Sequence, residues 1–506
     1  MRAKKAMYNT VTSLLYQVVA IVCGLITPRL ILQTFGSTYN GVISSATQFL
    51  SMINILNLGI AGATRVELYK SLAANDLLKT SRIIKATKQY MRKVAACVVI
   101  YTIVLMIIYP YISHSDLSTK STRILIGIVS IGTFAQYFFG ITYQTLLKSD
   151  QREYIYSVLQ IIATILNTFF SVVLIIVGCS IYTVKLVSSV TFAMSPIIMS
   201  IYVQHRYKLI KDCQADKTAL KNRGAAAFHS VANIIHNNTD LVILTIFTDA
   251  KVISVYTVYY LVIGKIKNIM QSFTNGLEAA FGNMWAKKEM DAIQRNFRIF
   301  EFFMFSFVAI IFSCVGVLII PFVSEYTKGI TDVNYIRYSL AGLITITEAV
   351  YCVRQPYLTL VQATGFYKET KNGAMLEALI NIVSSIILVQ FININGVIVG
   401  TLIANTFRTI QYALFISKNV LQRSIFEVVK RTVWLLITTL IIVLFSDFLT
   451  PLILLEGWFG WLVKALITFA LSFIVTVVMS FIFYRGDLIQ LVSMGQRMIL
   501  SKQRTR

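Results

Sequence analysis

The chain has 506 residues, of which 56% are hydrophobic and only 13% are charged. The charged share is about half that of a typical soluble domain, which excludes a soluble protein of several domains, and the high hydrophobic share excludes intrinsic disorder. The 46 Lys and Arg residues outnumber the 22 Asp and Glu residues, and in a membrane protein this excess is first explained by basic loops that set the topology.

Apolar segments long enough to cross a bilayer recur along the whole chain. They predict an all-α polytopic membrane protein with about 14 transmembrane helices. The first six predicted spans are 8–34, 41–65, 94–112, 123–147, 155–178 and 182–204. The next six are 229–248, 252–282, 299–323, 335–363, 373–392 and 396–417, and a final pair covers 431–450 and 458–484. The first span is expected to be a retained helix, since no small-residue cleavage site follows it.

Basic residues are concentrated in the two termini and in every second connection. These segments hold 33 Lys and Arg residues. The alternate connections hold only four, namely Lys120, Arg123, Lys251 and Lys328. The positive-inside rule therefore predicts a multi-pass protein of the cell membrane with both termini in the cytoplasm. The basic segments 66–93 and 205–228 could also touch anionic lipid or a partner enzyme.

Two parts of the chain resemble each other, which indicates an internal duplication. At an offset of 214 residues, Tyr143, Asn167 and Ser171 match Tyr357, Asn381 and Ser385. At an offset of 217, Tyr39, Gly59 and Lys70 match Tyr256, Gly276 and Lys287. We predict two six-helix repeats, 1–204 and 229–417, which a cytoplasmic linker, 205–228, connects. The remaining residues, 418–506, are predicted to form helices 13 and 14 and a cytoplasmic tail. Parallel repeats of this kind are typical of transporters that bind substrate between the halves.

Several cations lie deep within the predicted spans. A cation at mid-bilayer is costly, so such residues are expected to face a hydrated cavity or a partner. The acidic residues within the spans are only Asp240, Glu278, Glu348 and Glu377. Because they cannot neutralise all the basic residues, we predict an anionic ligand held by Arg29, Lys265, Arg354 and Arg408. The alternative is that these are paired structural charges, with the residues near helix ends reaching the interface.

Polar residues form stripes along several predicted helices. The stripes are His229, Asn233, His236, Asn237 and Asp240; Lys265, Asn268, Ser272 and Asn275; Thr401, Asn405, Arg408 and Tyr412; and Asn54 with Asn57. Together they favour a hydrated cavity, although each alone could join two helices by hydrogen bonds. Asp240 is the first candidate for coupling to an ion, with Glu278 and Glu348 behind it. Asp240 could instead pair permanently with Lys265.

The chain carries no enzyme signature. It has no G-x-x-x-x-G-K-[ST], G-x-S-x-G or H-E-x-x-H sequence. We therefore predict no catalytic residues, no metal site and no cofactor. Proline stands beside arginine in Pro28-Arg29 and in Arg354-Gln355-Pro356, where a bent helix could let a ligand approach.

The segment Ile26–Gly41 resembles the opening of bacterial polysaccharide flippases, the Wzx-type members of the multidrug/oligosaccharidyl-lipid/polysaccharide exporter superfamily. The shared features are Pro28-Arg29, the turn Phe35-Gly36 with Tyr39 and Gly41 behind it, and a second echo at Asn238-Thr239-Asp240. The second turn departs from this pattern, because Phe247-Thr248-Asp249 lacks the glycine.

The resemblance implies a flippase that moves undecaprenyl-pyrophosphate-linked oligosaccharide from the inner to the outer leaflet of the bacterial inner membrane. The repeat units would enter O-antigen of lipopolysaccharide, capsule or a similar glycan. It also implies the lipid bilayer, a glycan polymerase and a chain-length regulator as partners, and no nucleic acid. Two alternatives stay open: a drug or cation exporter of the same superfamily, and a non-transporting membrane component of a glycan assembly complex.

Overall fold

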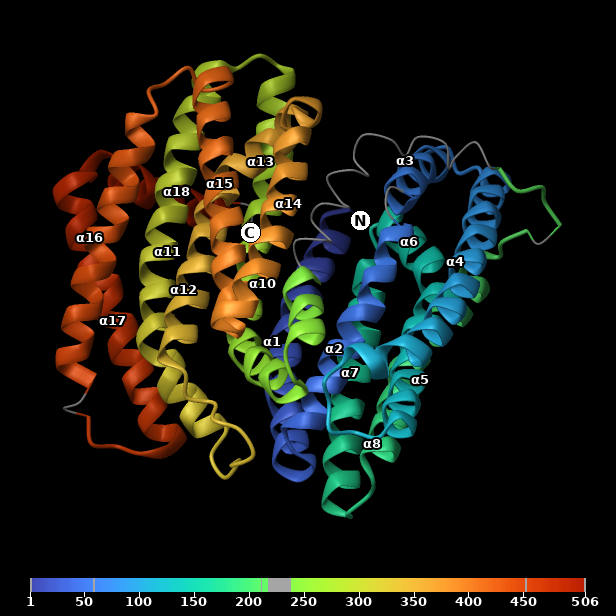
Figure 1. Cartoon of the computed structure of the whole chain (residues 1–506). Helices are drawn as coiled ribbons and strands as arrows, with labels where there is room; N and C mark the ends of the chain where they lie inside the picture. The colour runs from blue at the N-terminus through green and yellow to red at the C-terminus, as the bar shows by residue number, and fades with distance from the viewer. Residues whose placement is uncertain (1, 58–59, 211, 217–237, 451–452, 505–506) are drawn as a thin grey trace. The chain divides into compact units, whose positions relative to one another are not determined.

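The computed structural model describes residues 2–57, 60–210, 212–216, 238–450 and 453–504 (Figure 1). Within these ranges the regular structure is helical apart from one isolated bridge between His114 and Asp249. Nine of the described helices are long and apolar enough to cross a membrane. The prediction of an all-α polytopic membrane protein is therefore confirmed.

The chain divides into two compact units. Unit 1 comprises residues 1–257 and 329–333, and unit 2 comprises residues 258–328 and 334–506. The division falls inside one long helix, α10 (Ala250–Ala286). Most of the predicted linker 205–228 lies outside the described residues, and so the repeat boundaries at 204 and 229 stay a prediction.

Unit 1 is built from helices whose ends often extend beyond the predicted spans. They are α1 (Arg2–Phe35), α2 (Ser37–Ser51), η1 (Met52–Asn57), α3 (Ile60–Ala73), α4 (Leu77–Ile112), α5 (Thr119–Ala135), η2 (Gln136–Gly140), α6 (Ile141–Ser149), α7 (Glu153–Ile176), α8 (Ile181–Tyr207) and the short helix Asn238–Phe247. α4 starts well before the predicted span 94–112, because Asp76 caps it by accepting a hydrogen bond from the Lys79 amide at 2.8 Å.

Unit 2 contains the rest of α10 and the remaining helices. They are α11 (Met290–Tyr326), α12 (Tyr338–Val353), α13 (Gln355–Thr364), α14 (Tyr367–Ile392), α15 (Ile394–Asn419), α16 (Phe426–Leu449), α17 (Gly457–Phe483) and α18 (Arg485–Arg504). α11 packs against α12, α16 and α17 (Figure 1). Its buried aromatic residues, such as Phe297 and Phe305, form the centre of the main hydrophobic cluster of this unit.

The pair α16 and α17 buries hydroxyl residues and exposes apolar ones. Thr468, Ser472, Thr476 and Ser480 of α17 are all buried, whereas Leu466 is 62% exposed. Small polar side chains let membrane helices approach closely, while the apolar side chains remain available to lipid. This arrangement agrees with a lipid-facing role for the C-terminal helix pair.

Each of the two turns that the sequence pattern compares is followed by a helix that an acidic side chain caps. Gly36 has a φ of 86°, which only glycine adopts readily, and the next residue, Ser37, donates its backbone N–H to Asp332 at 2.7 Å. In the second turn, Asp249 itself accepts from the amide of Val252 at 2.8 Å. An acidic side chain therefore caps the following helix in both turns, and in the second turn that acid is part of the turn itself.

The matched residues of the duplication occupy equivalent positions. Tyr143 lies in α6 and Tyr357 in α13, and each of these helices follows an interruption in a predicted span. Ser171 of α7 and Ser385 of α14 are 1% and 0% exposed. The internal repeat stays a prediction, and the similar burial of these two residues agrees with it.

Candidate functional site

An interruption in the predicted span 335–363 places an arginine in the interior of unit 2. α12 ends at Val353 and α13 begins at Gln355, with Arg354 at the joint and Pro356 in the first turn of α13. Proline fits a first turn because the N–H that it lacks would have no helical partner there. By contrast, α1 runs through Pro28 without interruption.

Arg354 and Arg408 share one carboxylate. Nη1 of Arg354 donates to Oε1 of Glu377 at 2.5 Å, and Nε of Arg408 lies 3.4 Å from Oε2 of the same residue. The three side chains come from the α12–α13 joint, α15 and α14, and each is less than 9% exposed. Breaking a buried ion pair leaves an uncompensated charge, so these residues depend on one another for stability.

The surroundings of Arg408 hold its guanidinium in place. Its N–H groups donate to the carbonyl of Thr370 at 3.1 Å and to Gln411 and Tyr412 at 2.5 Å each. The guanidinium also stacks on the Tyr412 ring, 3.9 Å from its centroid. Gly373 of α14 faces this group, and a Cβ at that position would collide with both Arg408 and Gln411. The glycine therefore leaves room for the side-chain ends of Arg408 and Gln411 in this arrangement.

A second ion pair adjoins the first through an aromatic ring. Nζ of Lys267, on α10, lies 3.1 Å from Oε2 of Glu348 on α12, and both residues are buried. Lys267 is 4.0 Å from the centroid of the Tyr351 ring, and the Arg354 guanidinium is 4.6 Å from it. Tyr351 thus lies against a cation of each ion pair. We call the whole group the α10–α15 cluster, and its members are Lys267, Glu348, Tyr351, Arg354, Glu377 and Arg408. Cation–π contacts of this kind stabilise charges away from water.

The α10–α15 cluster carries more positive than negative charge. Its cations are Lys267, Arg354 and Arg408, and its carboxylates are Glu348 and Glu377. Among the described residues, three cations against two carboxylates leave one positive charge in excess in this cluster. Such a charge is expensive unless an anion or water approaches it, so the cluster is suited to binding an anionic group.

The predicted site residues fall in different places. Arg354 and Arg408 lie in the α10–α15 cluster, whereas Lys265 is half-buried on α10 and its neighbour Lys267 takes the place in the cluster. Arg29 is half-buried on α1, in unit 1. The four residues stay candidates, and the structure brings two of them together.

The predicted coupling residues have different surroundings as well. Asp240 accepts a hydrogen bond from the hydroxyl of Tyr256 at 3.2 Å. Glu348 is already paired with Lys267, which makes it a structural neutraliser of that cation. Glu278 is half-buried on α10. Asp240 belongs to a predicted polar stripe. The other members of that stripe lie outside the described residues, and they are His229, Asn233, His236 and Asn237.

Glu377 is one of the acidic residues within the predicted spans, but the sequence did not predict it as part of the site. The sequence signal that could have identified it is a stripe at intervals of four residues on α14, formed by Glu377, Asn381 and Ser385, all buried. This stripe faces the predicted stripe of α15, since Asn381 donates to the hydroxyl of Thr401 at 2.9 Å. In this case the polar stripe joins two helices, which is the alternative that the sequence left open.

A further buried ion network lies elsewhere in unit 2 and was not predicted. Glu301, which is 0% exposed, binds Arg423 and Arg431 and accepts from the hydroxyl of Tyr357 at 2.6 Å. Burial by itself would lower the pKa of Arg423, but its hydrogen bond and charge interaction with Glu301 raise that pKa above its ordinary value. Arg423 therefore stays charged, and the network remains ionic. Both arginines were counted only as basic loop residues.

No metal-binding arrangement is found in the part of the chain that the structure describes. No three His, Cys, Asp or Glu side chains gather there as they would around an ion. The buried carboxylates of the described residues, which are Glu301, Glu348, Glu377 and Asp487, each contact an arginine or a lysine.

Comparison with known proteins gives the fold. No family model and no curated protein matches the chain. The lipid II flippase MurJ, in an inward closed conformation, superposes with a TM-score of 0.67 at 16% identity over 96% of this chain and 100% of that chain. A MATE transporter of Vibrio cholerae gives 0.58 at 14% identity over 84% and 98%. An outward-facing MATE transporter of the MOP superfamily gives 0.58 at 11% identity over 83% and 96%. The chain therefore has the fold of MATE transporters and of MurJ.

Proposed function

We propose that this protein is a flippase that moves undecaprenyl-pyrophosphate-linked oligosaccharide from the inner to the outer leaflet of the bacterial inner membrane by alternating access. The observation that carries the proposal is the excess positive charge of the α10–α15 cluster. A fold that matches the lipid II flippase MurJ over 96% of the chain supports it. No enzymatic step is involved, and the glycan is O-antigen, capsule or a similar polymer.

The shared carboxylate suggests how a pyrophosphate would bind. Arginine presents two parallel N–H groups that match the oxygens of phosphate as well as those of carboxylate. Glu377 holds Arg354 and Arg408 in place while the site is empty, and a doubly charged pyrophosphate competes with it for the same guanidinium groups. The hydroxyl of Tyr412 and the amide of Gln411 contact Arg408 and are suited to neighbouring oxygens of the substrate.

The alternative is an exporter of drugs or cations, which the likeness to MATE transporters favours. A cation exporter needs a carboxylate that its ligand can reach. Within the α10–α15 cluster, Glu348 and Glu377 are each paired with a base, and the candidates left for a cation are Asp240 and Glu278, outside the cluster. The local charge therefore favours an anionic substrate.

Depletion of the protein in its host is the first test. A flippase predicts that a lipid-linked oligosaccharide accumulates in the inner leaflet, and its chemical analysis identifies the substrate. Loss of drug efflux without any accumulation would favour the exporter instead. Loss of polymer without accumulation would favour a non-transporting role in glycan assembly.

A charge-neutral double variant separates binding from folding. Arg354→Gln combined with Glu377→Gln removes both members of the pair and keeps the net charge of the cluster, while Arg408 loses its carboxylate but keeps its hydrogen bonds to Thr370, Gln411 and Tyr412. We expect a smaller loss of stability than Glu377→Ala causes, and loss of flipping by the folded protein in proteoliposomes. The matched control is Lys148→Gln with Glu153→Gln, a partly exposed pair at 2.9 Å outside the cluster. A double variant that folds and flips as fast as this control would overturn the role of Arg354.

A further inference from the structure

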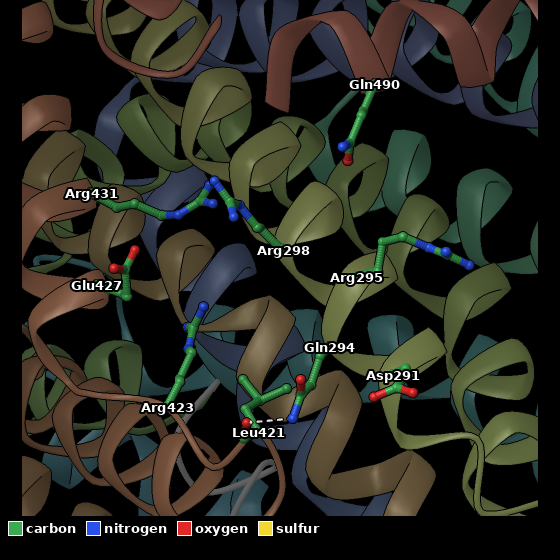
Figure 2. Close-up of a pocket in the computed structure, with 9 residues that line it drawn as sticks. All are labelled: Asp291, Gln294, Arg295, Arg298, Leu421, Arg423, Glu427, Arg431 and Gln490. Carbon is green, nitrogen blue, oxygen red and sulfur yellow. Dashed lines mark hydrogen bonds between the residues drawn. The ribbon is translucent and has the colours of Figure 1, made fainter. Parts of the chain in front are cut away.

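A cavity of about 460 Å³ lies in unit 2 beside the ion network of Glu301. It is formed by α11, α16, α18 and the segment that joins α15 to α16 (Figure 2). Its lining consists of Asp291, Gln294, Arg295, Arg298, Leu421, Arg423, Glu427, Arg431 and Gln490. These residues come from the ends of helices that the loop charges predict to be cytoplasmic. None of them belongs to the α10–α15 cluster.

Arg431 is the buried cation of this cavity. It is 2% exposed, and its Nη2 donates to Asp487 at 2.8 Å while its Nε lies 3.1 Å from Glu301. Its Nη1 has no hydrogen-bond partner in the described part of the chain. Figure 2 shows the side chain directed toward that of Arg298, which also binds Asp487. A lining residue of the cavity therefore carries a buried N–H group that lacks an acceptor among the described residues.

An apolar groove of about 740 Å³ adjoins this cavity and shares Arg298 and Glu427 with it. Its apolar lining is Phe426, Val429, Val433, Trp434, Ile437, Met479 and Phe483, from α16 and α17. Trp434 is 4% exposed, and its Nε1 has no acceptor among the described residues. Lys430 and Arg485 flank the groove, and each lies over a phenylalanine ring.

The two cavities together suit a ligand that is anionic at one end and apolar at the other. Some buried polar atoms of their linings have no partner within the described ranges. These atoms belong to Arg423, Arg431 and Trp434, and all of them are N–H donors. Glu301 and Asp487, the carboxylates behind them, are already bound by arginines. An incoming group must therefore accept hydrogen bonds and carry an apolar chain.

We propose that the two cavities together bind one anionic phospholipid of the cytoplasmic leaflet. Its phosphodiester would lie near Arg295 and Arg431, and an acyl chain would follow the groove along α16 and α17. Basic pockets between membrane helices on the cytoplasmic side bind anionic head groups by this combination of charge and apolar contact. The site is independent of the proposed transport function, and a lipid bound there ties α11, α16 and α18 together.

The test uses the full-length protein, purified and delipidated in a neutral detergent. Phosphatidylglycerol should bind, as seen by native mass spectrometry, and should raise the melting temperature more than phosphatidylcholine does.

The double variant Arg295→Gln with Lys430→Gln changes an exposed residue of each cavity, so it should fold. Removal of each charge should weaken binding about five-fold. The control Lys287→Gln with Lys288→Gln removes the same charge from exposed positions before α11 and should bind as the unaltered protein does.

A conservative change tests the groove separately. Trp434→Phe removes the unpartnered N–H but keeps an aromatic ring, and it should weaken phosphatidylglycerol binding, whereas Trp285→Phe, outside both cavities, should not. Equal binding by the charge variant and its control would overturn the site. Equal effects of phosphatidylcholine, or an equal shift with inorganic phosphate alone, would overturn an anionic phospholipid as the occupant.

Discussion

Nη1 of Arg354 lies 2.5 Å from Oε1 of Glu377, and both side chains are buried among apolar helices. An arginine that the sequence assigned to a substrate phosphate is therefore already bound by a carboxylate. The same carboxylate contacts Arg408, so one acid positions two candidate ligands. In the proposed function, substrate binding at this point would exchange one anion for another, which would avoid leaving an unpaired buried cation.

Replacement of the shared carboxylate should destabilise the protein strongly. Glu377→Ala leaves Arg354 and Arg408 without their acid, and loss of one partner from a buried ion pair costs about 3–5 kcal/mol. Thermal unfolding in detergent measures the change. Glu369→Ala, at an exposed position on the same helix, is the control and should be near neutral. Equal stability of the two variants would contradict the role of Glu377 in holding the arginines.

Asp240→Asn should preserve the fold, because the amide oxygen can still accept from the Tyr256 hydroxyl. If Asp240 couples transport to an ion, the variant should bind substrate but lose its dependence on the ion gradient in proteoliposomes. Tyr256→Phe removes only the hydrogen-bond donor and should keep that dependence.

If Asp240 instead forms a permanent structural pair with Lys265, Asp240→Asn should unfold the protein, and Lys265→Gln should restore its stability. Unchanged stability together with unchanged gradient dependence would place the coupling at another residue.

Gly36→Ala should destabilise unit 1. The backbone conformation of Gly36, with φ 86° and ψ 175°, costs a residue with a Cβ about 1–3 kcal/mol, and the new Cβ would lie 3.1 Å from Oδ2 of Asp332, which caps α2. Gly342→Ala is the matched control, since nothing lies within 4 Å of its Cβ position on α12. Alanine is favoured over glycine in a helix, so the control should be neutral or slightly stabilising. Equal melting temperatures would rule out a conformational requirement at Gly36.

The charge distribution of the loops predicts that 205–228 is cytoplasmic and 447–457 is external. In a variant without the native cysteines, a cysteine in place of the exposed Glu456 should react with an impermeant thiol reagent in intact cells. A cysteine in place of the exposed Asp212 should react only after the cells are opened. The reverse labelling pattern would invert the topology.

Much of the architecture follows from local sequence. Hydrophobic length predicted the membrane helices, because a bilayer demands about 20 apolar residues in succession. Pro356 predicted a bend in the span 335–363, because proline frees a backbone carbonyl, whereas the structure divides that span into α12 and α13 at Arg354. The polar stripe of Thr401, Asn405 and Arg408 was visible as well, since residues four or seven apart share one helical face.

Partners could be decided only by tertiary structure. Lys265 and Lys267 are equally basic, but residues two apart on a helix point about 200° from each other, so only one of them can face Glu348. The position of Glu348 on α12 selects Lys267. In the same way, Arg423 and Arg431 look like ordinary basic loop residues in the sequence, and they become buried ligands of Glu301 only because α11 brings that carboxylate to them. Helical periodicity is a local property, whereas the charge that a side chain meets depends on which helix lies opposite.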